Sequence, residues 1–114
     1  MKFEKFEEII AWQKAKELTL NIYAIFKDCR DYAFKDQIQR ASVSIMNNIA
    51  EGYERKTNNE FKHFLFIAKG SSGELRSMSY LAKDLKYISE DAYQNIYRLS
   101  TEISKMLSGL IKTL

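Results

Sequence analysis

Apolar side chains recur every three or four residues along four stretches of the chain, the spacing of one buried face on an amphipathic helix. The first stretch runs from Phe6 to Phe26 and the second from Phe34 to Arg55. The third runs from Asn58 to Tyr87, and the fourth from Glu90 to Leu114. Only short polar segments separate them, which favours neighbouring helices that alternate in direction.

The predicted helix starts carry capping signals. Thr57 is followed three residues later by Glu60, the pattern of a capping box. Ser89 is an N-cap candidate, with Glu90 and Asp91 in the first turn, where the helix dipole favours anions. The chain has no proline, which suits long helices with tight connections. The pattern predicts an all-α fold, an antiparallel up-down-up-down four-helix bundle formed by one domain over residues 1–114.

The third helix contains two glycines, Gly70 and Gly73. Each costs about 1 kcal/mol relative to alanine inside a helix. Either the helix breaks there, or another backbone packs closely against it. The apolar period stays in phase across both positions, which favours an unbroken helix beside a closely packed neighbour. We expect its core face to consist of Phe61, Phe64, Leu65, Ala68, Leu75, Met78, Leu81, Ala82 and Leu85.

Composition excludes some classes of protein. The chain is 46% hydrophobic and carries 18 basic and 15 acidic residues, a formal net charge of +3. This mild excess permits a nucleic-acid partner without requiring one. The single cysteine, Cys29, cannot form an internal disulfide and suits a reducing compartment. The acidic, interrupted N-terminal sequence does not resemble a signal peptide, and no apolar run approaches the ~20 residues of a membrane span. We expect a soluble, cytoplasmic protein with no membrane partner.

No pattern of reactive residues is evident. The sequence lacks a glycine-rich phosphate loop, a His-Glu-x-x-His pair and a Cys-x-x-Cys pair. His63 is the only histidine, and its spacing from Glu60 is that of an ordinary surface pair on a helix. We therefore predict no catalytic residue, no metal site and no cofactor, and do not expect the protein to be an enzyme.

The second helix carries a polar stripe apart from its apolar face. Arg40, Ser44, Asn47 and Glu51 fall on one side at ~3.6 residues per turn, flanked by Asn48 and Arg55. Serine and asparagine are weak helix formers, so this face is either a poorly forming exposed surface or a surface packed against other protein. In an antiparallel pair, residues of the second and third helices at equal distances from the turn between them lie side by side. This pairing predicts an ion pair between Arg40 and Glu74, within the chain or across a subunit contact.

The third helix carries a second stripe as well, which we call the heptad stripe. Basic residues seven positions apart alternate along it with aromatic residues and one glycine. Its members are Lys62, Phe66, Lys69, Gly73, Arg76, Tyr80, Lys83 and Tyr87. Such a stripe can bind phosphates and stack on bases, or it can face a neighbouring subunit with lysine stems covering aromatic rings. Phe66, Tyr80 and Tyr87 point away from the predicted core, which favours a homo-oligomer.

Three blocks of sequence bear on family membership. The most specific is Gln37–Gly52, QIQRASVSIMNNIAEG, and a second extends from Asn59 to Leu75. A weaker third block contains Trp12-Gln13-Lys14-Ala15, Leu18 and Tyr23. With these blocks the chain resembles the four-helix-bundle family encoded in intervening sequences of bacterial 23S ribosomal RNA genes. It departs from the family pattern at Met46 and at Phe26-Lys27, where proline is usual, and neither change threatens the helices. The motif residues that form a polar face are Arg40, Ser44, Asn48, Glu51, Ser71 and Glu74.

The resemblance implies a cytosolic bundle that assembles into a ring-like homopentamer. The chain is also similar to the accessory protein of diversity-generating retroelements, a basic pentameric bundle that partners a reverse transcriptase and its RNA. The leading hypothesis is therefore a non-enzymatic homo-oligomer that binds RNA, or a reverse transcriptase-like protein, through basic surface. The alternative is a protein-binding scaffold with no affinity for nucleic acid.

Overall fold

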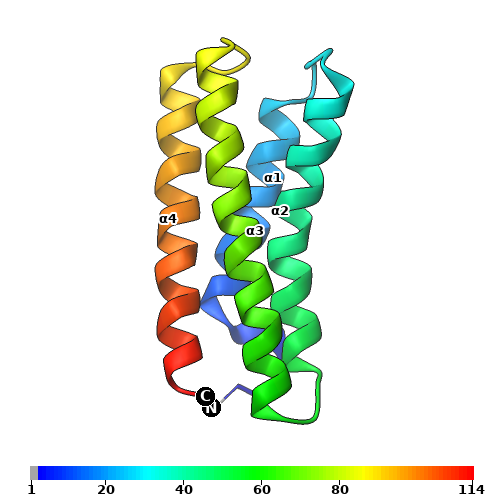
Figure 1. Ribbon diagram of the computed structural model, residues 1–114, viewed down its shortest axis with the longest axis vertical. Coiled ribbons are helices and arrows are strands. Elements are labelled where there is room, and N and C mark those ends of the chain that lie inside the picture. The colour runs from blue at the N-terminus through cyan, green and yellow to red at the C-terminus, as the bar shows by residue number, and fades with distance from the viewer. Residues whose placement is uncertain (1–2) are drawn as a thin grey trace.

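The computed structural model describes residues 3–114 and places four α-helices along the chain (Figure 1). They are α1 (Ile10–Ile25), α2 (Tyr32–Tyr53), α3 (Asn58–Asp84) and α4 (Glu90–Lys112). The four helices predicted from periodicity are confirmed, with shifted ends. The first predicted helix starts too early, because Phe6–Glu8 forms a separate 3-10 turn, η1, before α1 begins.

The helices form an up-down-up-down bundle. Each packs against the next along the chain, and α4 returns to pack against α1. The bundle measures 43 × 21 × 19 Å, and the C-terminus lies at the end that holds the α2–α3 turn (Figure 1). No strand occurs within residues 3–114. No helix of this part of the chain is long and apolar enough to cross a membrane.

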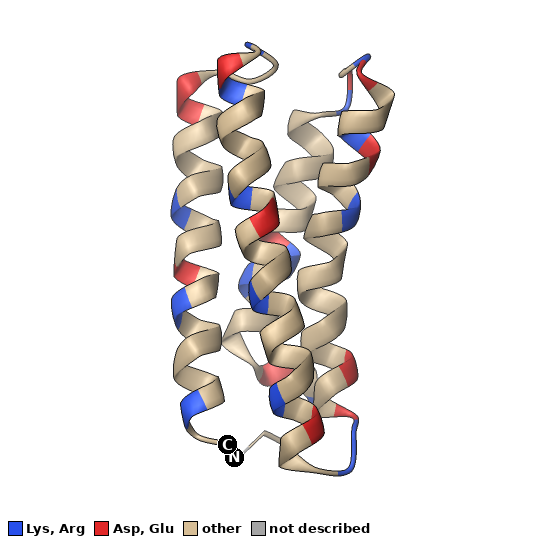
Figure 2. Ribbon diagram, in the orientation of Figure 1, with Lys and Arg blue, Asp and Glu red and all other residues tan. Residues whose placement is uncertain are grey.

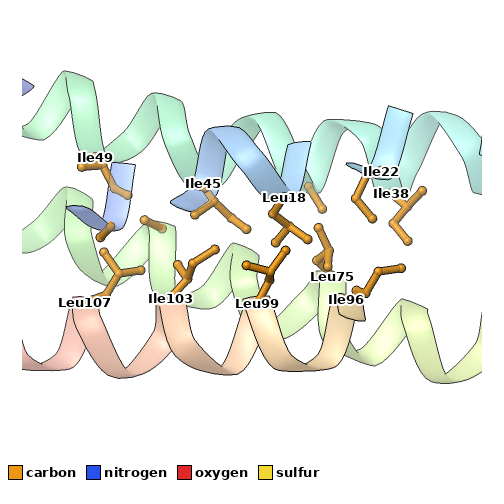
Figure 3. Packing of buried hydrophobic residues seen from close by; sticks show 14 of the residues in the cluster. Leu18, Ile22, Ile38, Ile45, Ile49, Leu75, Ile96, Leu99, Ile103 and Leu107 are labelled. Atoms are coloured by element: carbon orange, nitrogen blue, oxygen red, sulfur yellow. The ribbon is translucent and has the colours of Figure 1, made fainter. Parts of the chain in front are cut away.

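Branched aliphatic side chains from all four helices meet along the bundle axis (Figure 3). Burial of one such side chain contributes roughly 1.5–3 kcal/mol to folding. The apolar faces predicted for the first, second and fourth helices supply most of this core. Its fully buried members include Leu18, Ile22, Ile38, Ile45, Ile49, Leu65, Leu75, Ile96, Leu99 and Ile103.

The core face of α3 differs from the prediction at two apolar positions. Leu81 and Leu85 are 50% and 47% exposed, whereas Ser72 and Ser79 are completely buried. The buried residues of α3 follow alternating steps of four and three along the whole helix, and serines occupy two of these steps. The set is Phe61, Leu65, Ala68, Ser72, Leu75, Ser79 and Ala82. The sequence prediction left these two positions out of the core because serine is polar. In the structure each buried serine hydroxyl donates to a backbone carbonyl, which satisfies its hydrogen-bonding group.

The predicted helix caps are present. Thr57 accepts a hydrogen bond from the Glu60 backbone N–H at 3.1 Å, and Ser89 accepts one from Ala92 at 3.1 Å. The second half of the capping box differs, because the Glu60 carboxylate accepts from the Thr57 hydroxyl at 3.2 Å. Asp31 adds a cap at the start of α2 by accepting from the Phe34 N–H.

The glycines of α3 are not where helices approach most closely within the subunit. The helix passes unbroken through Gly70 and Gly73, as expected, but a Cβ atom at either position would meet nothing within 4 Å among the described residues. Residues 3–114 therefore do not supply the expected backbone neighbour. The tight approach occurs at Gly52 of α2, where a Cβ would lie 2.6 Å from Phe64 Cβ and 3.1 Å from Phe61 Cδ1.

Alanine substitutions at Gly52 and Gly70 should therefore have opposite effects. We expect Gly52→Ala to lower the free energy of unfolding by about 1–3 kcal/mol, because the added methyl group overpacks the α2–α3 contact. Gly70→Ala should raise it by about 0.5–1 kcal/mol through helix propensity. Urea denaturation followed by circular dichroism measures both. Stabilisation by both substitutions would show that the contact at Gly52 is not tight.

Candidate nucleic-acid interface

The polar face of the family motif contains a hydrogen-bonded group that joins α2 to α3. The Ser44 and Ser71 hydroxyl oxygens lie 2.9 Å apart across the two helices. Asn48 donates to the Ser44 carbonyl at 2.8 Å and to the Ser44 hydroxyl at 3.0 Å. All three residues are half-buried. Of the predicted stripe, Ser44 therefore packs against α3, whereas Arg40, Asn47 and Glu51 are exposed.

The remaining motif residues lie outside this group, and the predicted Arg40–Glu74 ion pair is wrong within the subunit. Arg40 Nε instead lies 2.8 Å from Asp36 Oδ2, one turn earlier on its own helix, and its side chain is 79% exposed. Glu74 accepts a hydrogen bond from Gln37 at 3.4 Å. The alignment of α2 with α3 along the bundle axis was predicted correctly. Arg40 nevertheless pairs with an acid one turn away on its own helix, which its side chain reaches more easily than an acid on the next helix.

Glu51 likewise pairs within α2, with Arg55 at 2.9 Å. Arg55 also approaches Glu60 of α3 at 3.8 Å, and its guanidinium group lies 4.7 Å from the centre of the Phe64 ring. Arg55 therefore connects the two helices in the way predicted for Arg40.

The heptad stripe follows α3 from Lys62 to Lys83 but does not include Tyr87. Phe66 and Tyr80 are exposed, as expected from the sequence. Tyr87 is also exposed, but it lies beyond the end of α3 and turns towards the α1–α2 connection. Its hydroxyl donates to Asp31 at 2.7 Å, and this hydrogen bond lowers the pKa of the Asp31 carboxyl. Tyr87 therefore holds two connections together at one end of the bundle.

A groove between α3 and α4 contains the central cations of the stripe. Lys69 and Arg76 of α3 face Lys105 and Lys112 of α4 across an open space of about 490 Å³. Its other lining residues are Thr101, Ser104, Ser108 and Gly109, all from α4. We call these eight residues the basic groove. Basic segments recur along both of these helices in Figure 2.

Sequence interpretation missed the α4 side of this groove, although a signal was present. Arg98, Lys105 and Lys112 are seven residues apart, like the cations of α3. Seven residues span about 10.5 Å of helix. The contacts between Ser72 and the segment Ser100–Ser104 place the middle of α3 beside the middle of α4. Lys69 is therefore level with Lys105 on the opposite rim of the groove, whereas Arg98 lies outside the groove lining and pairs with Glu102.

The four cations of the groove form no ion pairs with described acidic residues. These cations are Lys69 and Arg76 of α3 and Lys105 and Lys112 of α4. Glu102 of α4 instead lies 3.6 Å from both Lys14 and Arg98. Unpaired cations on two sides of a concave surface produce a positive potential that attracts anions.

One polar atom of the groove also lacks a partner. The Thr101 hydroxyl oxygen is inaccessible to solvent and forms no hydrogen bond to any described residue. Helix threonines usually donate to the carbonyl four residues earlier, which here belongs to Tyr97. The Ser100 hydroxyl donates to that carbonyl at 3.2 Å. Chemically, the basic groove offers four cations suited to an anion, whereas the Thr101 hydroxyl is closed to solvent and the Ser104 hydroxyl donates to Ser72. Residues 3–114 contain no cluster of three His, Cys, Asp or Glu side chains that could hold a metal.

The fold and the groove define an all-helical bundle with a paired basic surface. A family model described as 23S rRNA-intervening sequence protein matches residues 7–109, so the chain belongs to that family. A crystal structure from Bacteroides thetaiotaomicron, of a protein of unknown function from the S23 ribosomal protein family, is 28% identical. The match covers 90% of this chain and 98% of that one with a TM-score of 0.84. No protein with a curated description matches significantly.

Arginine substitutions can test the two different roles of Arg40 and Arg55. Arg40→Ala should change the free energy of unfolding by no more than about 0.5 kcal/mol, because an exposed pair within one helix is weak. Arg55→Ala should cost about 1 kcal/mol or more, because it removes an ion pair and a cation–π contact between helices. Thermal and urea denaturation measure both. The opposite ranking would contradict these assignments, and loss of assembly by Arg40→Ala would place Arg40 at a subunit contact.

Proposed function

We propose that this protein is a cytoplasmic, non-enzymatic homo-oligomer that binds RNA through the basic groove. The observation that carries the proposal is the pairing of two cations from α3 with two cations from α4 across one groove. Phosphate oxygens accept hydrogen bonds from lysine and arginine side chains, so the four cations suit a nucleic-acid backbone.

The number of cations limits the affinity of a single groove. Each phosphate contact to single-stranded nucleic acid contributes a slope of about −0.7 in a plot of log affinity against log salt. Four contacts give a slope near −3, so affinity should fall roughly 50-fold between about 50 and 200 mM salt. Contacts of this kind position a backbone and carry little sequence information.

Assembly would multiply the grooves. The outer side of α3 exposes four large apolar residues, Phe66, Ile67, Leu81 and Leu85. Gly70 and Gly73, on the same helix, leave open space where a second backbone could approach. These features support contact with another copy of the chain, and the family resemblance suggests five copies. Linked grooves raise the affinity for a long RNA through effective concentration alone.

Light scattering tests assembly directly. In solution at micromolar concentration we expect a mass several times that of the 13.4 kDa chain, and about five times if the family comparison holds. Leu81→Glu should reduce this mass, because it places a charge on the outer side of α3. A monomer at all concentrations for the unmodified chain would contradict the proposal.

RNA titrations with charge-reversed variants test the groove. The triple variant Lys69→Glu, Lys105→Glu, Lys112→Glu should lose more than about tenfold in affinity, because each lost phosphate contact weakens binding. Its control, Lys16→Glu, Lys27→Glu, Lys56→Glu, changes net charge equally at three exposed lysines outside the groove and should lose less than about threefold.

Both triple variants are compared at low and moderate salt, and light scattering checks their assembly. Unchanged affinity in an assembled groove variant would exclude the groove as the RNA site. If the unmodified protein binds no RNA, the protein-scaffold alternative is favoured. If the groove variant dissociates into monomers, the groove is a subunit contact.

A further inference from the structure

Three tyrosines gather beside one end of the basic groove, and we call them the tyrosine cluster. Tyr80 comes from α3, whereas Tyr93 and Tyr97 come from α4. Their ring centroids lie 5.4 Å apart for Tyr80–Tyr93, 6.2 Å for Tyr80–Tyr97 and 6.0 Å for Tyr93–Tyr97. Tyr93 is only 6% exposed, but Tyr80 and Tyr97 are 45% and 38% exposed. One buried ring therefore supports two rings that face solvent.

The cluster is continuous with the basic groove. Thr101, which lines the groove, also lines a hollow of about 380 Å³ together with Tyr97 and Lys105. On α3, Arg76 precedes Tyr80 by one helical turn, about 6 Å. A polynucleotide whose phosphates contact the groove cations would therefore pass next to the exposed tyrosine rings.

The immediate surroundings of the cluster also suit a nucleotide. Lys83 Nζ lies 4.4 Å from the centre of the Tyr93 ring and 5.9 Å from that of Tyr80. Burial raises the pKa of the Tyr93 hydroxyl to about 12. The Tyr93 hydroxyl is neutral at physiological pH, as an ordinary tyrosine also is, and adds no negative charge to the cluster.

We propose that the tyrosine cluster stacks on an unpaired base, so that the groove selects single-stranded RNA over duplex RNA. This inference rests on the proposed RNA binding by the groove. In a duplex the faces of each base are covered by its neighbours, whereas the bases of a single strand can turn outwards and stack on aromatic rings. The groove cations contact phosphates in both forms, but only a single strand also gains the stacking contact.

The test compares single-stranded and duplex RNA of equal length in titrations with the full, assembled protein. We expect the double variant Tyr80→Leu, Tyr97→Leu to lose roughly 5- to 100-fold in affinity for the single strand, the range for one lost stacking contact. Duplex affinity should stay within about twofold, because its phosphate contacts remain. The variant Tyr80→Phe, Tyr97→Phe keeps both rings and should bind like the unmodified protein. Tyr23→Leu, on α1 and also 45% exposed, is the matched control.

The outcomes separate this inference from RNA binding itself. Loss of both RNA forms in the groove variant, with selective loss of the single strand in the tyrosine variant, supports both proposals. Unchanged single-strand affinity in the tyrosine variant overturns the stacking proposal and leaves the groove proposal standing. Equal losses for both RNA forms, or dissociation of the tyrosine variant into monomers, also overturn stacking. If the unmodified protein binds neither RNA form, both proposals fail.

Discussion

Ser72 lies in the middle of the α3–α4 contact, where its hydroxyl donates to the Ser100 carbonyl at 2.9 Å and accepts from Ser104 at 3.0 Å. Ser72 and Ser100 are completely buried. A leucine at either place would separate the helices or displace its neighbours, since packed interiors tolerate little added volume. The small side chains let the two helices approach, and the hydrogen bonds satisfy the polar groups that this approach buries.

This contact also fixes the position of α3 relative to α4 along the bundle axis, and the candidate interface depends on that relative position. The cations of α3 and α4 both repeat every seven residues. With Ser72 beside Ser100 and Ser104, Lys69 becomes level with Lys105, and Tyr80 reaches Tyr93 and Tyr97. A relative shift of half a heptad, about 5 Å, would stagger the two rows of cations. The buried serines therefore align the charged rims as well as the core.

Periodicity and capping patterns were enough to predict the number, order and approximate ends of the helices. These patterns did not predict the burial of residues whose environment depends on which side of the helix packs against a neighbouring helix. Leu81 and Leu85 are apolar and fall within the predicted periodic pattern, yet both lie outside the core while two serines enter it. Tyr87 shares the heptad spacing, but α3 ends at Asp84, so the spacing no longer controls its direction.

The sequence predicted only the α3 side of the candidate site. The stripe on α3 was conspicuous because lysines alternate with rings, whereas the cations of α4 alternate with serines, a threonine and a glycine. Pairing of the two rows is a tertiary property, which one helix considered alone cannot show. The partner of Arg40 was mispredicted for a related reason. Matching heights identifies which residues are level but not which of several nearby acids an exposed arginine contacts.

The proposed assembly and the proposed RNA binding are coupled by thermodynamics. A single groove offers four cations, so one subunit alone would hold a polynucleotide weakly. An RNA long enough to occupy two grooves gains affinity from the subunit contact between them. By linkage, the same RNA then stabilises that contact by an equal free energy. The apolar outer side of α3 and the basic groove beside it would therefore act together, although they bind different kinds of surface.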